Sequence, residues 1–66
     1  MSVTYTVVQR MGGARTIRVS SLSHALRLAA TDLDKGDHPY QIIDGAQLFS
    51  SQQIMVLLKK AGLSRN

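Results

Sequence analysis

The residues best suited to chemistry in this sequence lie together in the stretch TDLDKGDHPY, residues 31–40. This stretch holds three of the four acidic residues of the chain, and the fourth, Asp44, follows shortly after. Clustered carboxylates are typical of calcium sites and of general acid–base catalysis. A helix end followed by a polar turn is the simpler interpretation of the same residues.

The spacing of the aspartates does not fit a calcium loop. An EF-hand loop that begins at Asp32 requires an oxygen ligand at its fifth position and glycine at its sixth, but Gly36 and Asp37 stand there in the reverse order. The last position of the loop, which should be glutamate, is Ile43. We therefore expect a helix C-terminus and a turn over this stretch, and no metal site.

The other nucleophiles and bases form no catalytic motif. The chain has no cysteine and no glutamate, and its serines stand where helix caps are needed. His24 falls at a helix start and His38 precedes a proline in a loop, so no local spacing pairs them. We therefore expect a protein that is not an enzyme and that uses no cofactor. A small hydrolase or nuclease built on His24 or His38 is the alternative from another functional class.

The basic residues are the stronger functional signal. The net charge is +4 in 66 residues, and four arginines precede the acidic stretch. A basic balance favours encounter with polyanions or with acidic surfaces. We therefore expect the partner-binding residues to be these arginines, namely Arg10, Arg15, Arg18 and Arg27.

The elements that position these arginines begin with a β-hairpin. Apolar and polar residues alternate over 3–7 and over 16–19, which is typical of half-buried strands. Gly12 and Gly13 lie between the two strands and tolerate positive φ, as a hairpin turn requires.

The choice of turn sets the register of this hairpin. A two-residue Gly-Gly turn would place Val7 opposite Arg18, which mixes apolar and charged side chains on one face. A three-residue turn over 11–13, with Gly13 left-handed, places Val7 opposite Ile17 instead. We therefore predict the three-residue turn.

The alternation of the strands then places the arginines. Arg10 and Arg18 stand at even-numbered positions in strands whose odd-numbered residues are apolar, so both should lie on one exposed sheet face. Arg15 should project near the same hairpin tip. Tyr5 belongs to the core in this arrangement, so the face lacks the aromatic residues of a stacking platform for single-stranded nucleic acid.

The remainder of the chain predicts a helix, a second hairpin and a second helix. Ser21 is a good N-cap and Gly36 a good C-terminal residue for an amphipathic helix over about 22–35. The later elements are a strand over 40–43 opened by Pro39, a turn at Asp44-Gly45, a return strand over 46–49, and a helix over about 51–61 capped by Ser50 and Gln53. The order ββαββα predicts one small α+β domain over residues 1–66, with a small antiparallel sheet and two helices on one sheet face.

Nothing in the sequence predicts contact with a membrane. No apolar run approaches the roughly 20 residues that a membrane-spanning helix needs. The N-terminal residues MSVTYTVVQR lack the basic region and apolar run of a signal peptide. We therefore expect a cytoplasmic protein.

The front two-thirds of the chain resembles a class of small phage and mobile-element proteins. The matching residues are Tyr5-Thr6-Val7-Val8 in the hairpin and Ser21-Leu22-Ser23-His24-Ala25-Leu26-Arg27-Leu28-Ala29 in the helix. Some anti-CRISPR proteins are similar in size and in the order of their elements. The resemblance implies a stoichiometric inhibitor that docks on a nucleic-acid-guided host complex through basic side chains. It does not extend to the final helix, 51–61.

We therefore expect a non-enzymatic binding protein, an inhibitor of the anti-CRISPR type, whose partner is a protein or a nucleoprotein complex. The alternative is a domain that binds double-stranded nucleic acid directly through the same arginines. An exposed edge strand can also extend the sheet of a partner or pair with its own copy, so a homodimer is a further option.

Overall fold

The computed structural model describes residues 2–63 and contains two β-hairpins, each followed by a helix. The four strands form one antiparallel sheet in the order β2-β1-β3-β4. This arrangement confirms the predicted small α+β fold of order ββαββα. The elements are β1 (Val3–Val8), β2 (Ala14–Val19), α1 (Leu22–Asp34), β3 (His38–Asp44), β4 (Gln47–Ser50) and α2 (Ser51–Lys60).

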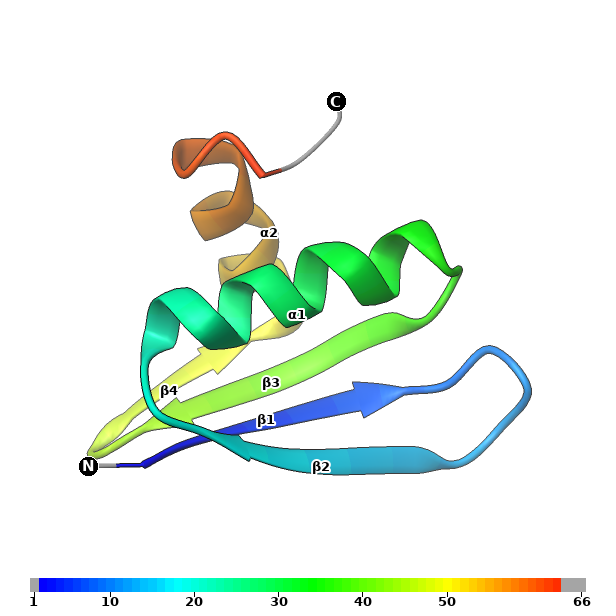
Figure 1. Ribbon diagram of the computed structural model, residues 1–66, viewed down its shortest axis with the longest axis horizontal. Helices are drawn as coiled ribbons and strands as arrows, with labels where there is room; N and C mark the ends of the chain where they lie inside the picture. Colours follow the sequence, from blue (N-terminus) through cyan, green and yellow to red (C-terminus); the bar gives the residue numbers. More distant parts are fainter. Residues whose placement is uncertain (1, 64–66) are drawn as a thin grey trace.

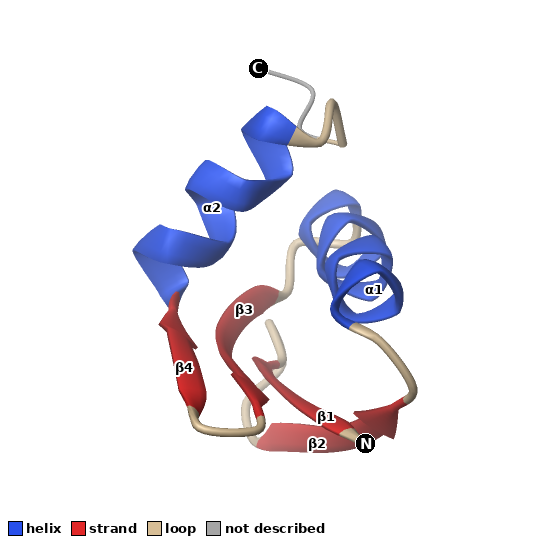
Figure 2. Ribbon diagram, turned by 90° about the vertical axis from the view of Figure 1, so that its left-hand side faces the viewer, coloured by secondary structure: helices blue, strands red, loops and turns tan. Residues whose placement is uncertain are grey.

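Both helices lie on the same face of the sheet (Figure 1). Helix α1 packs against β1 and β3, α2 packs against β3 and β4, and the two helices also contact each other. Figure 2 shows that α2 continues directly from the end of β4, at the edge of the sheet opposite β2. No helix or strand within residues 2–63 covers the opposite face, which we call the open face. The edge strands are β2 and β4.

The core between the sheet and the helices is aliphatic, with one buried tyrosine. Because side chains alternate along a strand, Val3, Tyr5 and Val7 all point from β1 toward the helices. The residues that complete the buried core are Val19, Ala25, Leu26, Ala29, Ile42, Ile54 and Leu58.

The first hairpin has a three-residue turn, but one position earlier than predicted. The backbone N–H of Gln9 donates to the carbonyl of Gly13 at 2.9 Å, and the N–H of Gly12 donates to the carbonyl of Gln9 at 3.0 Å. The turn residues are therefore 10–12 rather than 11–13. Gly13 has the predicted positive φ, at 83°, and Gly12 also has one, at 103°.

The predicted register of this hairpin was therefore wrong. Val7 lies opposite Arg15 instead of Ile17, a difference of two residues. A shift of two positions keeps every side chain on its own face of the sheet. Thr6 and Thr16 accordingly meet on the open face, with their hydroxyl oxygens 3.3 Å apart. The main consequence concerns Arg15, which lies within the strand pair beside Val7 and not at the hairpin tip.

Strand β3 begins earlier than predicted and contains the only proline. The strand starts at His38, so Pro39 lies inside it rather than at its opening. The pairing between β1 and β3 changes register between Thr6 and Val7, where Pro39 lies opposite Val7. Proline lacks a backbone N–H, and such an irregularity is where a central strand tolerates it.

The helix ends follow the sequence closely. Ser21 caps α1 through its side chain, and Ser50 with Gln53 forms the predicted capping box on α2. Gly36 follows α1 with a φ of 90°, as a residue after a helix C-terminus requires.

Candidate binding surface

The structure does not bring the four predicted arginines onto one face. Arg18 is exposed and lies on the open face of β2, beside the Thr6–Thr16 pair. Arg10 belongs to the turn and not to β1. Its Cδ atom lies 3.0 Å from the position that a Cβ of Gly36 would occupy, so its side chain lies over the connection between α1 and β3. The prediction that Arg10 and Arg18 share a sheet face was therefore wrong, because strand alternation does not extend to residue 10.

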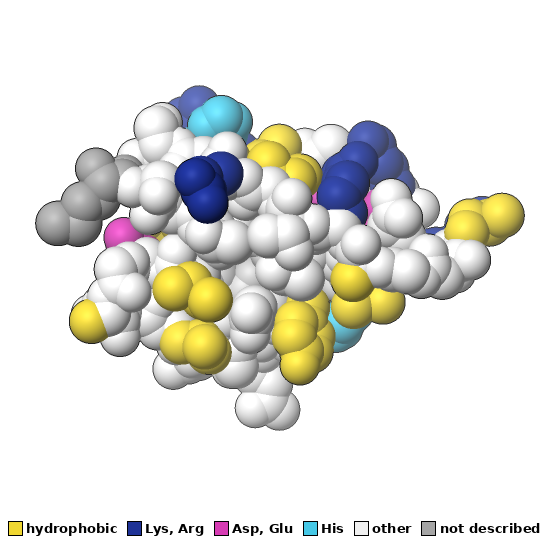
Figure 3. Space-filling model, turned by 90° about the horizontal axis from the view of Figure 1, so that it is seen from below, with side chains coloured by type: hydrophobic (Ala, Val, Ile, Leu, Met, Phe, Trp, Pro, Cys, Tyr) yellow, Lys and Arg dark blue, Asp and Glu magenta, His cyan; other side chains and the backbone are white. Residues whose placement is uncertain are grey.

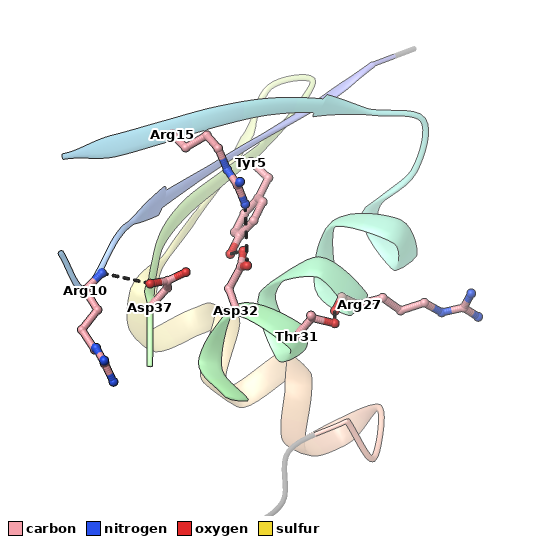
Figure 4. Close-up of polar contacts among 7 residues, drawn as sticks. All are labelled: Tyr5, Arg10, Arg15, Arg27, Thr31, Asp32 and Asp37. Atoms are coloured by element: carbon pink, nitrogen blue, oxygen red, sulfur yellow. Dashed lines mark hydrogen bonds and ion pairs between the residues drawn. The ribbon is translucent and has the colours of Figure 1, made fainter. Parts of the chain in front are cut away.

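The other two arginines point in different directions. Arg15 lies on the helix side of β2, where 50% of its side chain is exposed and its Nη2 atom is 3.8 Å from Oδ1 of Asp32. Arg27 is exposed on α1, and Figure 4 shows its side chain pointing away from those of Arg10 and Arg15.

Three of the arginines are nevertheless close together in the chain, on β2 or in the turn before it. Arg15 and Arg18 lie on the edge strand β2, and Arg10 lies in the turn that precedes it. In Figure 3 the visible Lys and Arg side chains lie in the upper half of the molecule, and several hydrophobic side chains lie in the lower half. We call the surface formed by Arg10, Arg15 and Arg18 the β2-edge surface.

A buried polar cluster lies behind this surface. Asp32 is only 3% exposed, and the hydroxyl of Tyr5 donates a hydrogen bond of 2.8 Å to its Oδ2 atom (Figure 4). The guanidinium of Arg15 approaches the other carboxylate oxygen. The cluster therefore connects β1, β2 and α1.

Sequence reasoning missed this cluster because it assigned Asp32 to a polar helix end. A signal was present, since Asp32 follows Ala25 and Ala29 at helical spacing and therefore lies on the apolar stripe of α1. The carboxylate gives Arg15 a partner on the helix side of β2. A buried charge is costly unless it is paired and hydrogen-bonded, and Tyr5 and Arg15 together supply those partners.

The environment of Tyr5 keeps its hydroxyl protonated. Burial raises the pKa of the Tyr5 phenol far above its usual value, and the hydrogen bond to Asp32 and the negative charge of Asp32 raise the pKa further. Tyr5 therefore remains a hydrogen-bond donor at neutral pH.

This raised pKa predicts a loss of stability in alkaline solution. The unfolded chain releases the Tyr5 proton near pH 10, whereas the folded protein retains it. The contribution of Tyr5 to the free energy of unfolding is therefore fully present below about pH 10 and is lost as the pH rises above it. We expect the free energy of unfolding to fall by up to about 1.4 kcal/mol per pH unit from this one group. Urea unfolding between neutral pH and alkaline pH measures the slope.

The matched variants are Tyr5→Phe and Tyr40→Phe, which each remove one tyrosine. Tyr40 is 54% exposed, whereas Tyr5 is fully buried. The alkaline slope should shrink in Tyr5→Phe and persist in Tyr40→Phe. An unchanged slope in Tyr5→Phe would refute the assignment to Tyr5.

Asp37 lies next to this cluster, because its backbone N–H donates to the carbonyl of Asp32 at 2.9 Å. Asp37 accepts a hydrogen bond of 2.9 Å from the backbone N–H of Arg10, which fastens the hairpin turn to the end of α1. Within residues 2–63 no three His, Cys, Asp or Glu side chains gather as a metal site would require. His38 contacts Ser51, with 3.0 Å between Nε2 and Oγ. Sequence spacing did not predict this contact, which brings together the residue types of a base and a nucleophile.

Comparison with known proteins identifies no relative. No protein-family model matches the chain, and no curated protein or solved structure matches it either. Among the helices in residues 2–63, neither has the length and apolar character needed to cross a membrane.

Proposed function

We propose that this chain is a non-enzymatic binding protein whose β2-edge surface docks on an acidic surface of a protein or nucleoprotein complex. The observation that supports the proposal most is the combination of features on β2. Within residues 2–63 this strand has a neighbour on one side only, and it carries Arg15 and Arg18, with Arg10 in the adjoining turn.

The unpaired side of β2 offers a partner backbone hydrogen bonds. An extended segment that adds to a sheet edge pairs with its N–H and C=O groups, and neighbouring side chains give specificity. Arg15 and Arg18 lie on opposite faces of β2, so an added strand would meet a cation on each face. Guanidinium groups bind carboxylates and phosphates through charge-assisted hydrogen bonds, and they speed the encounter with acidic partners.

The arginines should not contribute equally. Arg18 is exposed on the open face, and no aspartate contacts it at ion-pair distance among the described residues. The charge of Arg15 is partly offset by Asp32. We therefore expect partner binding to depend more on Arg18 than on Arg15. The resemblance to small phage proteins supports a role as an anti-CRISPR-type inhibitor within this proposal.

The first test is binding to free nucleic acid across a salt series, for the wild type and for Arg10→Ala/Arg18→Ala. A direct binder of duplexes would show a slope of log affinity against log salt of about −0.9 for each phosphate contact. A protein that docks on a protein surface should instead bind free DNA and RNA weakly at physiological salt. Tight, salt-steep binding that the double variant loses would replace this proposal with the nucleic-acid alternative.

The second test is recovery of a complex from host lysate. The wild type should retain a defined partner, and Arg10→Ala/Arg18→Ala should lose it. The matched control is Lys59→Ala/Lys60→Ala, which removes the same two charges from the last turn of α2. Equal loss of the partner in the lysine variant would show a general effect of charge and contradict a specific β2-edge surface.

A further inference from the structure

The opposite edge of the sheet has a different chemical character. Residues 45–58, which include β4 and most of α2, contain no Asp, Glu, Lys or Arg. Two large apolar side chains of this region are exposed, Leu48 by 57% and Val56 by 52%. A shallow groove lies between β4 and α2, lined by Phe49, Gln53, Val56 and Leu57. We call this region the β4–α2 surface; its residues are Leu48, Phe49, Gln53, Val56 and Leu57.

The apolar side chains flank the free edge of β4 on both faces. Leu48 lies opposite Ile43, whose own partner on β1 is Thr4, so Leu48 points to the open face. Phe49 points to the helix side, where it lines the groove with Val56. Within residues 2–63, β4 has a neighbouring strand on one side only. A strand that pairs with β4 would therefore lie beside apolar side chains on both faces of the sheet.

The charges distinguish the two edges. Two copies that paired through β2 would bring Arg15 and Arg18 of both copies into one interface, and like charges across a strand pair are destabilising. Charged residues on an edge strand are a common means of preventing such pairing. The uncharged stretch 45–58 has no such obstacle, although the chain as a whole carries a net charge of +4.

We propose that a second copy of this chain binds at the β4–α2 surface, with the two β4 strands antiparallel about a two-fold axis. The sheet would then continue from one copy into the other. Such an interface is self-complementary, because the same surface of each copy faces that of the other. An uncharged apolar surface meets this condition, whereas a nucleic acid would gain no phosphate contacts here.

The two-fold axis restricts the register of this strand pair. An axis perpendicular to the sheet keeps each side chain on its own face, so residues that lie opposite must belong to the same face. The centre of the pair must therefore fall on a residue and not between two residues. The registers that overlap this short strand best place Leu48 opposite its copy or Phe49 opposite its copy.

The size of the surface is compatible with a reversible dimer. A standard interface covers about 800 Å² on each partner, less than a fifth of the 4502 Å² exposed by the protein. A four-residue strand and one face of a ten-residue helix supply an interface at the small end of the range. We therefore expect association that depends on concentration. Association through β4 does not involve the β2-edge surface, which stays exposed in the dimer.

Sedimentation equilibrium over about a hundredfold range of protein concentration tests the proposal. The wild type should pass from the mass of one chain to that of two. Leu48→Lys and Val56→Lys each place a cation in the apolar interface, so the dissociation constant should rise by about 100-fold or more. Met11→Lys adds the same charge at the hairpin tip, at a residue that is 91% exposed, and should dimerise like the wild type.

Three results would overturn the proposal. A wild type that stays monomeric at all concentrations excludes the dimer, and dimerisation of Leu48→Lys and Val56→Lys at wild-type strength excludes this surface. Circular dichroism checks that the variants fold. Amide exchange of the wild type gives a second measurement, in which the N–H groups of β4 should gain protection as concentration rises while those of β2 do not. Equal behaviour of the two edges would also contradict the proposal.

Discussion

Replacing Tyr5 by phenylalanine should destabilise the protein by about 2–3 kcal/mol, although the ring remains buried. The substitution removes the hydrogen bond of 2.8 Å to Asp32 and leaves a carboxylate that is 3% exposed with Arg15 at 3.8 Å. A hydrogen bond to a buried charged group is worth more than an ordinary one, because the group left behind has lost its water. The midpoint of thermal unfolding should fall by about 10–20 °C.

A second substitution separates this cause from simple loss of packing. Adding Asp32→Leu to Tyr5→Phe makes both partners apolar, so most of the lost stability should return. Arg15 is half exposed and can return to water in the double variant. Tyr40→Phe, at a residue that is 54% exposed, is the control and should change little. A double variant as unstable as Tyr5→Phe would show that the unpaired carboxylate is not the cause.

The order of elements was predictable because its signals are local. Alternation of side chains marks the strands, and Ser21, Gly36 and Ser50 stand where helix caps are needed. Each of these signals depends on residues within a few positions of one another. The predicted boundaries of both helices accordingly agree with the structure to within one residue.

The register of the first hairpin was not predictable from the same local signals. Gly12 and Gly13 both adopt positive φ, so their presence does not indicate which three residues form the turn. The observed turn depends on contacts with distant residues. Asp37 accepts a hydrogen bond from the backbone N–H of Arg10, and Asp32 lies 3.8 Å from the guanidinium of Arg15. Both aspartates are far along the chain, beyond the reach of any turn rule.

The candidate site shows the same division between local and distant effects. Strand alternation correctly placed Arg18 on the open face, because its neighbours lie in the same strand. Alternation failed for Arg10, which lies beyond the end of β1, and it carried no information on the partner of Arg15. The sequence thus identified the charged side chains, whereas the tertiary structure determines the direction in which Arg10 and Arg15 point.

Truncation of the core side of α2 should have the other large effect. Leu58→Ala removes most of a side chain that is 0% exposed, and such changes cost about 2–5 kcal/mol. A domain of 66 residues has a total stability of about 3–10 kcal/mol, so the variant should lose a large share of it. Urea unfolding at low protein concentration measures the change. Val56→Ala is the matched control, because Val56 lies two residues earlier on α2 and is half exposed.

The expected contrast between these variants follows from how α2 is held in place. An isolated helix of ten residues is too short to be stable in water, so α2 depends on packing. Two side chains of α2 are fully buried, Ile54 and Leu58, and they lie one turn apart on the same face of the helix. Truncation of Leu58 should therefore weaken the packing of α2 against β3 and β4. It should also disrupt the groove between β4 and α2 that Val56 lines. Equal effects of Leu58→Ala and Val56→Ala on monomer stability would show that α2 is not fixed by this contact.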